Sequence, residues 1–327
     1  MVTPTSVHHI GVVVRSMDEA LAFFRDALGL PLLAEEVVQD QGVRAALLDL
    51  GNGFLELLEP TVPDTGIARY LDRRGEGLHH VCLEVPDIDA ALAGLKQDNV
   101  ALVDETPRRG LTGTIAFLHP SALHGVLVEL VHGPTAFRRP VPDPWPLAHD
   151  PGGATRGAAP IQRLDHIILA VQQLQEAAAD WARVLGLQAQ TPHHPEGSHL
   201  QLARLPLSDS DAGGPFLELV AVGGGPGRSD SERPALSESE GPHRSEKRGP
   251  EGSERPHRLA RFIADRGEGM FSISLEVDDL DTAVAELRAK DIPVSDPEPG
   301  SWPGTRLARV PRASAHGVAV QMIERAP

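Results

Sequence analysis

The sequence predicts an α+β fold of two domains, because one strand-and-helix pattern occurs four times in 327 residues. Each copy joins an apolar strand to an amphipathic helix whose first turn carries acidic residues. The copies begin at Val7, Leu78, Leu164 and Met270. Repetition of one supersecondary unit indicates a fold built from internal repeats. A chain of this length accommodates two domains that each bury a hydrophobic core.

The first two copies each continue as a β-α-β-β-β unit. In the first unit, we expect strands at 7–15, 32–38, 43–50 and 54–58 and a helix at 17–28. In the second unit, we expect strands at 78–85, 101–103, 114–118 and 126–131 and a helix at 88–97. A short helix at 65–73 connects the units. Glycine-containing turns separate the strands, and apolar residues recur at helical intervals within the helices.

Two segments without apolar periodicity divide the chain. Residues 134–162 are rich in Pro, Gly and Ala, so we predict a linker between a first domain at 1–133 and a second domain at 163–327. Residues 223–257 are poor in apolar residues and rich in Ser, Glu, Arg, Gly and Pro. Such a composition does not bury enough surface to offset the entropy of ordering, so we predict a disordered insertion in the second domain.

Charge and composition indicate a soluble, cytoplasmic protein that binds a small molecule. The net charge of −16 argues against nucleic acid as a partner, since phosphate-backbone binding needs a basic face. No apolar run approaches the roughly 18 residues of a membrane span. The single cysteine, Cys82, excludes an intramolecular disulfide, and its apolar surroundings favour a buried hydrophobe over a nucleophile.

Two histidines and two glutamates occupy matching places in the two units of the first domain. His9 and His80 are each the second histidine of a pair in the first strand of a unit. Glu56 and Glu129 each lie in the middle of an apolar strand, where a carboxylate is costly unless paired, protonated or bound to metal. One such histidine alone is more often a hydrogen-bonded core residue. Together the four predict a divalent metal site, for which the sequence leaves Co, Mn, Zn, Ni and Fe open.

Six short runs carry a family resemblance that covers nearly all of residues 7–131. They are His8-His9-Ile10-Gly11, Gln41-Gly42-Val43-Arg44, Glu56-Leu57-Leu58-Glu59-Pro60, Gly75-Glu76-Gly77-Leu78-His79-His80, Phe117-Leu118-His119-Pro120 and Gly125-Val126-Leu127-Val128-Glu129-Leu130. In these runs the first domain resembles the methylmalonyl-CoA epimerases of the vicinal oxygen chelate superfamily. The resemblance implies paired β-α-β-β-β modules that form a cupped mixed sheet. It also implies a metal bound at His9, Glu56, His80 and Glu129.

The resemblance further implies an isomerase that interconverts methylmalonyl-CoA stereoisomers, with an acyl-CoA as its small-molecule partner. In this chemistry a cation stabilises negative charge on the thioester oxygen while carboxylates move the proton at C2. Glu129 is the candidate base. Some epimerases carry a glutamate where this chain has Ala45, and the family often has a lysine at the position of Ser121. Arg108 and Arg109 are either a docking point for a carboxylate or phosphate, or solvated loop charges.

The second domain resembles the same superfamily more loosely. The positions equivalent to the four ligands are His166, Glu218, Ser272 and Gln321. Two strong ligands are too few for a tight site, so we expect a metal-free domain that packs against the first domain or binds a ligand. His193, His194 and His199 are expected on the solvated surface rather than in a replacement metal site.

The sequence leaves three other functions open. An extradiol dioxygenase also uses four modules in one chain, and a glyoxalase-type lyase shares the metal set. A non-catalytic small-molecule-binding relative needs a hydrophobic cup without metal. The retained ligand residues of the first domain favour an enzyme. The sequence also leaves open whether the first domain pairs with the second domain of its own chain or with a second copy in a homodimer.

Overall fold

The structure is a computed structural model that describes residues 2–39, 41–111, 113–133, 161–207, 214–223 and 254–326. Residues 134–160 of the predicted linker and residues 224–253 of the predicted insertion lie outside the described residues. The last four residues of the predicted insertion are described and begin a helix. No described helix is long and apolar enough to cross a membrane.

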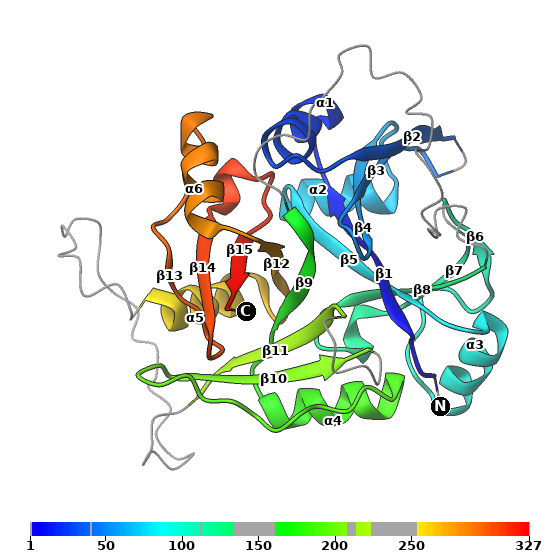
Figure 1. Cartoon of the computed structure of the whole chain (residues 1–327). Coiled ribbons are helices and arrows are strands. Elements are labelled where there is room, and N and C mark those ends of the chain that lie inside the picture. Colours follow the sequence, from blue (N-terminus) through cyan, green and yellow to red (C-terminus); the bar gives the residue numbers. More distant parts are fainter. Residues whose placement is uncertain are drawn as a thin grey trace, which may run out of the picture.

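The first domain forms one mixed sheet of eight strands (Figure 1). The strands are β1 (Ser6–Val13), β2 (Leu32–Val38), β3 (Val43–Asp49), β4 (Phe54–Pro60), β5 (Gly77–Glu84), β6 (Arg108–Arg109), β7 (Thr114–Leu118) and β8 (Leu127–His132). The helices are α1 (Met17–Leu21), which continues as a π-helical turn over Ala22–Ala27, α2 (Gly66–Arg74) and α3 (Ile88–Gln97). The strand order is β2-β3-β4-β1-β5-β8-β7-β6. Two β-α-β-β-β units therefore lie side by side and join where β1 and β5 pair antiparallel.

The second domain repeats this arrangement with seven strands. They are β9 (Ile161–Ala170), β10 (Leu200–Pro206), β11 (Phe216–Val222), β12 (Gly269–Val277), β13 (Glu298–Pro299), β14 (Thr305–Val310) and β15 (Val320–Arg325). The helices are α4 (Leu174–Leu185), α5 (Glu254–Arg266) and α6 (Leu280–Ala289). The strand order is β10-β11-β9-β12-β15-β14-β13, without a counterpart of β2 in the described segment 186–199. The predicted α+β fold of two domains is confirmed.

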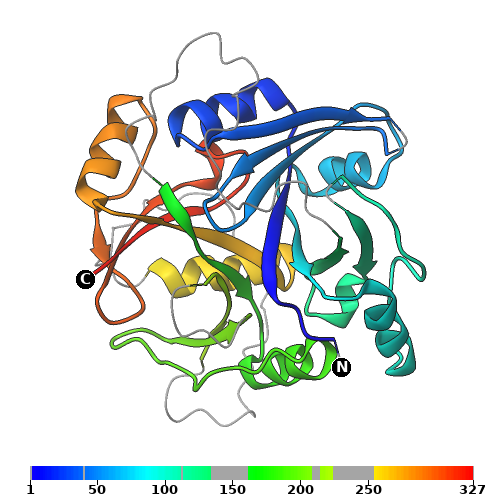
Figure 2. The same ribbon diagram turned by 45° about the vertical axis from the view of Figure 1, so that its right-hand side comes forward.

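The helix starts follow from residues that the sequence supplies at each turn. Ser16, Asp87 and Asp279 each accept a hydrogen bond from the backbone N–H three residues later. Each such N-cap typically contributes about 1 kcal/mol to helix stability. These caps fix the beginnings of α1, α3 and α6, which lie with α4 around the outside of the molecule (Figures 1 and 2).

Two elements differ from the sequence expectation. The strand predicted at 101–103 is a single bridge between Leu102 and Leu118. The Asp104 carboxylate accepts the Phe117 N–H at 3.0 Å, so the backbone pairing stops there. Helix α5 was not expected, because the charged composition of the segment before it conceals a short apolar stripe that includes the fully buried Leu259.

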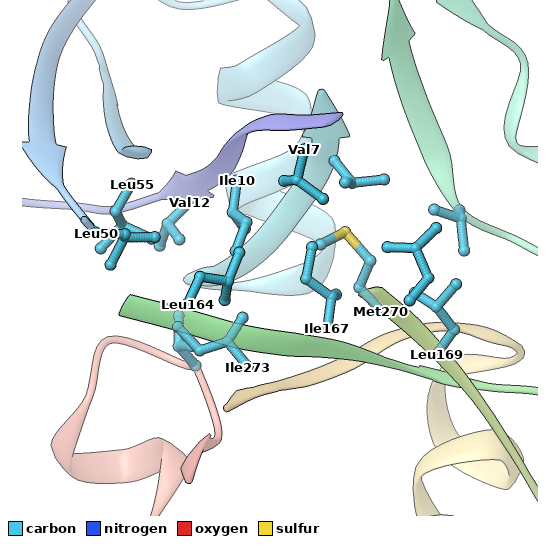
Figure 3. Close-up of a cluster of buried hydrophobic side chains, with 14 of the residues drawn as sticks. Val7, Ile10, Val12, Leu50, Leu55, Leu164, Ile167, Leu169, Met270 and Ile273 are labelled. Carbon is cyan, nitrogen blue, oxygen red and sulfur yellow. The ribbon is translucent and has the colours of Figure 1, made fainter. Parts of the chain in front are cut away.

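The two sheets pack against each other through one face of each. Ile10 and Val12 of β1 lie in the same buried cluster as Ile167 and Leu169 of β9 (Figure 3). Full burial of one such side chain contributes about 1.5–3 kcal/mol. Because side chains alternate along a strand, His9 points to the opposite face of the first sheet from Ile10. The second domain therefore covers one face of the first sheet and leaves the candidate site on the other.

Glycines allow the backbones of the two domains to touch. A Cβ on Gly125 would lie 2.2 Å from the carbonyl oxygen of Glu268, and a Cβ on Gly317 would lie 1.9 Å from that of Glu76. Both glycines also have a positive φ, which side-chain-bearing residues rarely adopt. The two contacts are reciprocal, since each pairs a turn of one domain with the strand entry of the other.

The same two glutamates also bridge the domains through their carboxylates. Glu76 contacts His316 Nδ1 of the second domain at 3.2 Å. Glu268 contacts His124 Nδ1 of the first domain at 3.1 Å. The matching geometry indicates an approximate two-fold relation between the domains, which fixes their relative position.

Candidate metal centre

The four predicted ligands lie on adjacent strands in the middle of the first sheet, where β4, β1, β5 and β8 are neighbours (Figure 1). Gly11 of β1 pairs with Glu56 on one side and with His80 on the other. His9 lies two residues before Gly11, so its side chain emerges on the same face. Glu129 lies on β8, which continues the sheet beyond β5. The register alone thus brings the four side chains together.

The donor atoms of the four side chains converge. His9 Nε2 lies 3.0 Å from His80 Nε2, 3.5 Å from Glu56 Oε2 and 3.8 Å from Glu129 Oε2. His80 Nε2 lies 3.3 Å from Glu129 Oε2 and 3.6 Å from Glu56 Oε2. Ligand atoms held about 2.1 Å from one ion lie roughly 3–4 Å from one another. His9, Glu56 and His80 each offer a ligand atom within 4.8 Å of the others, and Glu129 lies 3.3 Å from His80, so the donor set suits a divalent ion in chemistry and these contacts suit it in spacing.

Burial sets the protonation of the cluster. None of the four residues is more than 6% exposed. Burial lowers the pKa of His9 and of His80 well below its usual value, and a neighbouring imidazole lowers each further. Burial raises the pKa of Glu56 to about 7, and burial together with Glu56 raises the pKa of Glu129. The histidines are thus neutral, the form that binds metal, and a cation offsets the cost of ionising the carboxylates.

Two further histidines, His8 and His79, to which the sequence pattern assigned no role, hold the predicted ligand imidazoles in place. In the β1–β5 pairing, the partners of Val7 and His9 are adjacent residues of β5, so His8 between them is bulged out of register. The partners of Leu78 and His80 are likewise adjacent residues of β1, so His79 is bulged out of register. A bulge re-aims a side chain, and each extra histidine meets the ring of its successor. His8 Nδ1 lies 2.8 Å from His9 Nδ1, and His79 Nδ1 lies 3.0 Å from His80 Nδ1. Because the neighbouring histidine engages Nδ1 of His9 and of His80, the Nε2 atom of each ring points to the candidate metal centre.

Gly11 makes room for the His80 ring. A Cβ at this position would lie 2.1 Å from His80 Cε1 and 2.3 Å from His80 Nδ1. Real Cβ atoms do not approach other atoms so closely, so any larger residue displaces the ring. The glycine in the run His8-His9-Ile10-Gly11 was the sequence signal for this requirement.

Arg108 and Arg109 are both exposed, but among the described residues only Arg108 contacts an aromatic ring beside the centre. The Arg108 guanidinium carbon lies 5.4 Å above the Phe117 ring, which meets the His80 ring edge-on at 5.5 Å. Arg108 also pairs with Asp104 at 3.3 Å. Of the two arginines noted in the sequence, only Arg108 is therefore placed one ring away from a predicted ligand.

Three other residues noted in the sequence are not among the four predicted ligands. Ala45 is buried in a small apolar cluster with Leu58 and Leu71. Ser121 is exposed on a 3-10 turn. Cys82 is fully buried, and burial raises the pKa of its thiol well above the usual value. Glu56 and Glu129 are therefore the carboxylates of the centre.

The second domain places its four equivalent residues in the same register. Phe216 pairs with His166 as Phe54 pairs with His9, and Ser272 and Gln321 follow the same correspondence. Gln321 Nε2 donates a hydrogen bond to Ser272 Oγ at 3.1 Å. The side chains at the two positions without a strong metal ligand thus hydrogen-bond to each other.

The remaining two equivalents are also engaged within the protein. The His166 ring contacts the Asp165 carboxylate through Nδ1 and the Ser274 hydroxyl through Nε2, the latter at 3.1 Å. The indole N–H of Trp302 donates to the Glu218 carboxylate. These contacts form a buried polar network, in which Glu218 Oε2 lies 3.6 Å from His166 Nε2 without a hydrogen-bond partner among the described residues.

Ile168 occupies the place of Gly11 in the second domain, since each pairs with the residue at the third ligand position, Ser272 or His80. Ile168 is 1% exposed, so its side chain fills the space that a histidine ring takes in the first domain. The second domain therefore differs from the first by a repacked interior and not by one lost ligand.

The three loop histidines of the second domain divide into two groups. His194 and His199 are exposed, as expected. The expectation for His193 was wrong, because its ring stacks on Trp302 with centroids 4.6 Å apart and its Nε2 contacts the Ser301 carbonyl oxygen at 2.8 Å. An aromatic partner far along the chain, which local composition does not reveal, holds this histidine.

Comparison with known sequences places both domains in related families. Residues 8–117 match the Glyoxalase/Bleomycin resistance protein/Dioxygenase superfamily, and residues 164–321 match a Glyoxalase-like domain. An uncharacterized protein of Bacillus subtilis, YqjC, is 39% identical over 123 residues, which are 37% of this chain and 88% of that protein. The mitochondrial methylmalonyl-CoA epimerase of Bos taurus is 36% identical over 126 residues, which are 38% of this chain and 72% of that protein.

One solved structure is similar over both domains. It is a mutant of 4-hydroxymandelate synthase from Streptomyces coelicolor, with a TM-score of 0.65 and 16% sequence identity. The similarity covers 99% of this chain and 94% of that chain. At this identity the likeness concerns the fold, and it extends the shared fold to the pairing of the two domains.

Proposed function

Because the chain belongs to the glyoxalase/bleomycin resistance protein/dioxygenase superfamily, we propose that its first domain is a metal-dependent epimerase that interconverts methylmalonyl-CoA stereoisomers. The observation that carries this proposal is the convergence of two imidazoles and two carboxylates on one face of the sheet. The stretch that contains them is also the stretch that is similar to the bovine epimerase.

The metal ligands in this proposal are His9, Glu56, His80 and Glu129. The ion is divalent, and Co, Mn, Zn, Ni and Fe each suit this mixture of nitrogen and oxygen donors. When bound, such an ion supplies Lewis-acid stabilisation of the negative charge that develops on a thioester oxygen. His8 and His79 keep the two imidazoles oriented through their Nδ1 contacts.

The proton at C2 moves to Glu129. The C2–H bond breaks, the proton joins a carboxylate oxygen, and the electron pair moves toward the thioester carbonyl. Burial and the neighbouring Glu56 raise the pKa of Glu129 in the metal-free chain, whereas a bound cation lowers it, so Glu129 is the candidate base because of its place in the centre. The position that carries a second glutamate in some epimerases is Ala45, packed against Leu58 and Leu71. Glu129 therefore returns a proton to the face of C2 from which it was taken more often than a proton is delivered to the opposite face.

The two domains support the alternative functions less well than the epimerase function. A dioxygenase of this architecture uses the second sheet for its metal, but His166 and Glu218 are bonded to Asp165, Ser274 and Trp302. Ile168 also fills the space beside them. A non-catalytic binding role requires no carboxylate pair in the first domain, whereas Glu56 and Glu129 are retained and buried.

The test is epimer conversion. We expect the metal-loaded chain to convert one C2 epimer of methylmalonyl-CoA into the other, followed by a stereospecific coupled assay. The same preparation is offered a catechol in an oxygen electrode, and no oxygen uptake is expected. Oxygen uptake without epimer conversion would replace the epimerase proposal by the dioxygenase alternative.

A further inference from the structure

A cavity of about 490 Å³ lies on the boundary between the two domains. The first domain lines it with Tyr70, Arg74 and His79, and the second domain lines it with Arg266 and Arg312. Cavities of 300–1,000 Å³ are typical of small-molecule sites. The reciprocal backbone contacts at Gly125 and Gly317 border this cavity, so the position of its two walls is fixed.

The cavity adjoins the candidate metal centre. His79, which lines it, lies 3.0 Å from His80 through their Nδ1 atoms. Leu127, which also lines it, is the residue that pairs with His80 across β5 and β8. A ligand in the cavity is therefore separated from a predicted metal ligand by a single side chain.

Three arginines give this cavity a positive wall in a protein with a net charge of −16. Arg74 donates to the carbonyl oxygen of Arg266 at 2.7 Å, where α2 and α5 end. Arg312 donates to the Phe271 carbonyl oxygen, and its guanidinium lies 4.8 Å above the Phe262 ring. None of the three arginines forms an ion pair with a carboxylate of the described residues.

Other groups around the cavity do not neutralise this charge. Among the lining residues, the acidic one is Glu268, and its carboxylate is occupied by the N–H of Gln172 at 2.6 Å and by His124 at 3.1 Å. Burial, together with the charge of Arg266, lowers the pKa of Arg312 to about 10. Among the described residues no carboxylate neutralises these neighbouring guanidinium groups, which favours an anionic ligand between them.

We propose that this cavity binds the phosphate groups of the acyl-CoA substrate, and that the second domain supplies Arg266 and Arg312 for that purpose. The planar guanidinium donates in a fork that matches phosphate oxygens. This inference rests on the proposed epimerase function, because it places the thioester end of the same ligand at His80. It gives the metal-free domain a role in completing the site of the first domain.

The first experiment measures binding without turnover. The probe is adenosine 3′,5′-bisphosphate, titrated calorimetrically into the full chain. We expect Arg266→Gln to weaken binding about tenfold, which corresponds to about 1.4 kcal/mol, because a charge-assisted hydrogen bond to phosphate is lost. Arg266 is suitable because its side chain makes no hydrogen bond with a described residue. The control is Arg306→Gln, an exposed arginine of the same domain that pairs with Asp281 and Glu324.

The second experiment links the cavity to the substrate. For methylmalonyl-CoA we expect the KM of Arg266→Gln to be about tenfold that of the parent chain. For the pantetheine thioester, which lacks the nucleotide phosphates, we expect the ratio of these two KM values to be about one. Equal bisphosphate binding by Arg266→Gln and the parent chain overturns the inference. Bisphosphate binding that depends on Arg266 in a chain without epimerase activity supports the phosphate site and refutes the proposed function.

Discussion

His80→Ala is expected to abolish stoichiometric metal binding. The His80 Nε2 atom lies within 3.6 Å of a donor atom of each of the other three predicted ligands. Its removal therefore leaves the predicted set of four metal ligands incomplete. Loss of an outer partner of a ligand already costs roughly 10- to 100-fold in affinity, and loss of a ligand costs more. We expect elemental analysis to fall from about one ion per chain to less than about 0.1.

The matched control is His166→Ala, which changes the equivalent histidine of the second domain. His166 is held by Asp165 and Ser274, and Ser272 and Gln321 stand at two of the four ligand positions of its domain, so metal content is expected to stay at about one ion per chain. Melting temperatures of both variants are compared with the chelated parent chain, which separates metal loss from unfolding. Full metal in His80→Ala together with metal loss in His166→Ala would place the ion in the other domain.

Gly11→Ala is expected to have nearly as large an effect, although Gly11 offers no ligand atom. The added Cβ would lie 2.1 Å from His80 Cε1, so the imidazole must leave its position. Overpacking of this kind typically costs about 1–3 kcal/mol of stability, and the displaced ring no longer meets the other donors. Elemental analysis and thermal unfolding of the same preparation measure both effects.

The control for this variant is Gly53→Ala, in the turn beside the same strand. A Cβ there meets nothing closer than 3.4 Å, an ordinary contact distance. Metal content and melting temperature are expected to match those of the parent chain. Retention of full metal by Gly11→Ala would show that the His80 ring is not required in the position that the structure gives it.

The repeat in the sequence was sufficient to predict the fold class and to bring the four ligands together. Symmetry made this possible, because His9 and His80, and likewise Glu56 and Glu129, occupy equal places in repeated units. The roles of His8 and His79 depend on β-bulges, which are a property of the strand pairing and have no local signal. The pair of adjacent histidines in the first strand of each unit was the one sequence feature that pointed to these roles.

Helix α5 was missed for a different reason. Leu259, Phe262 and Ile263 recur at helical spacing and pack on the second sheet, but they follow a long charged segment. Composition averaged over that segment hid three apolar residues. The cavity between the domains was beyond sequence reasoning, because Arg74 and Arg266 are 192 residues apart and meet only through the pairing of the two sheets.

The most direct test of the proposed metal-dependent proton transfer is deuterium exchange at C2 of methylmalonyl-CoA, followed by proton NMR in heavy water. With about one divalent ion per chain, we expect C2 to exchange, and to exchange faster than the epimers interconvert, because Ala45 leaves Glu129 as the base. Removal of the ion by a chelator is expected to stop exchange, and its return to restore it. Exchange that continues unchanged in the metal-free chain, or fails with metal bound, contradicts this mechanism.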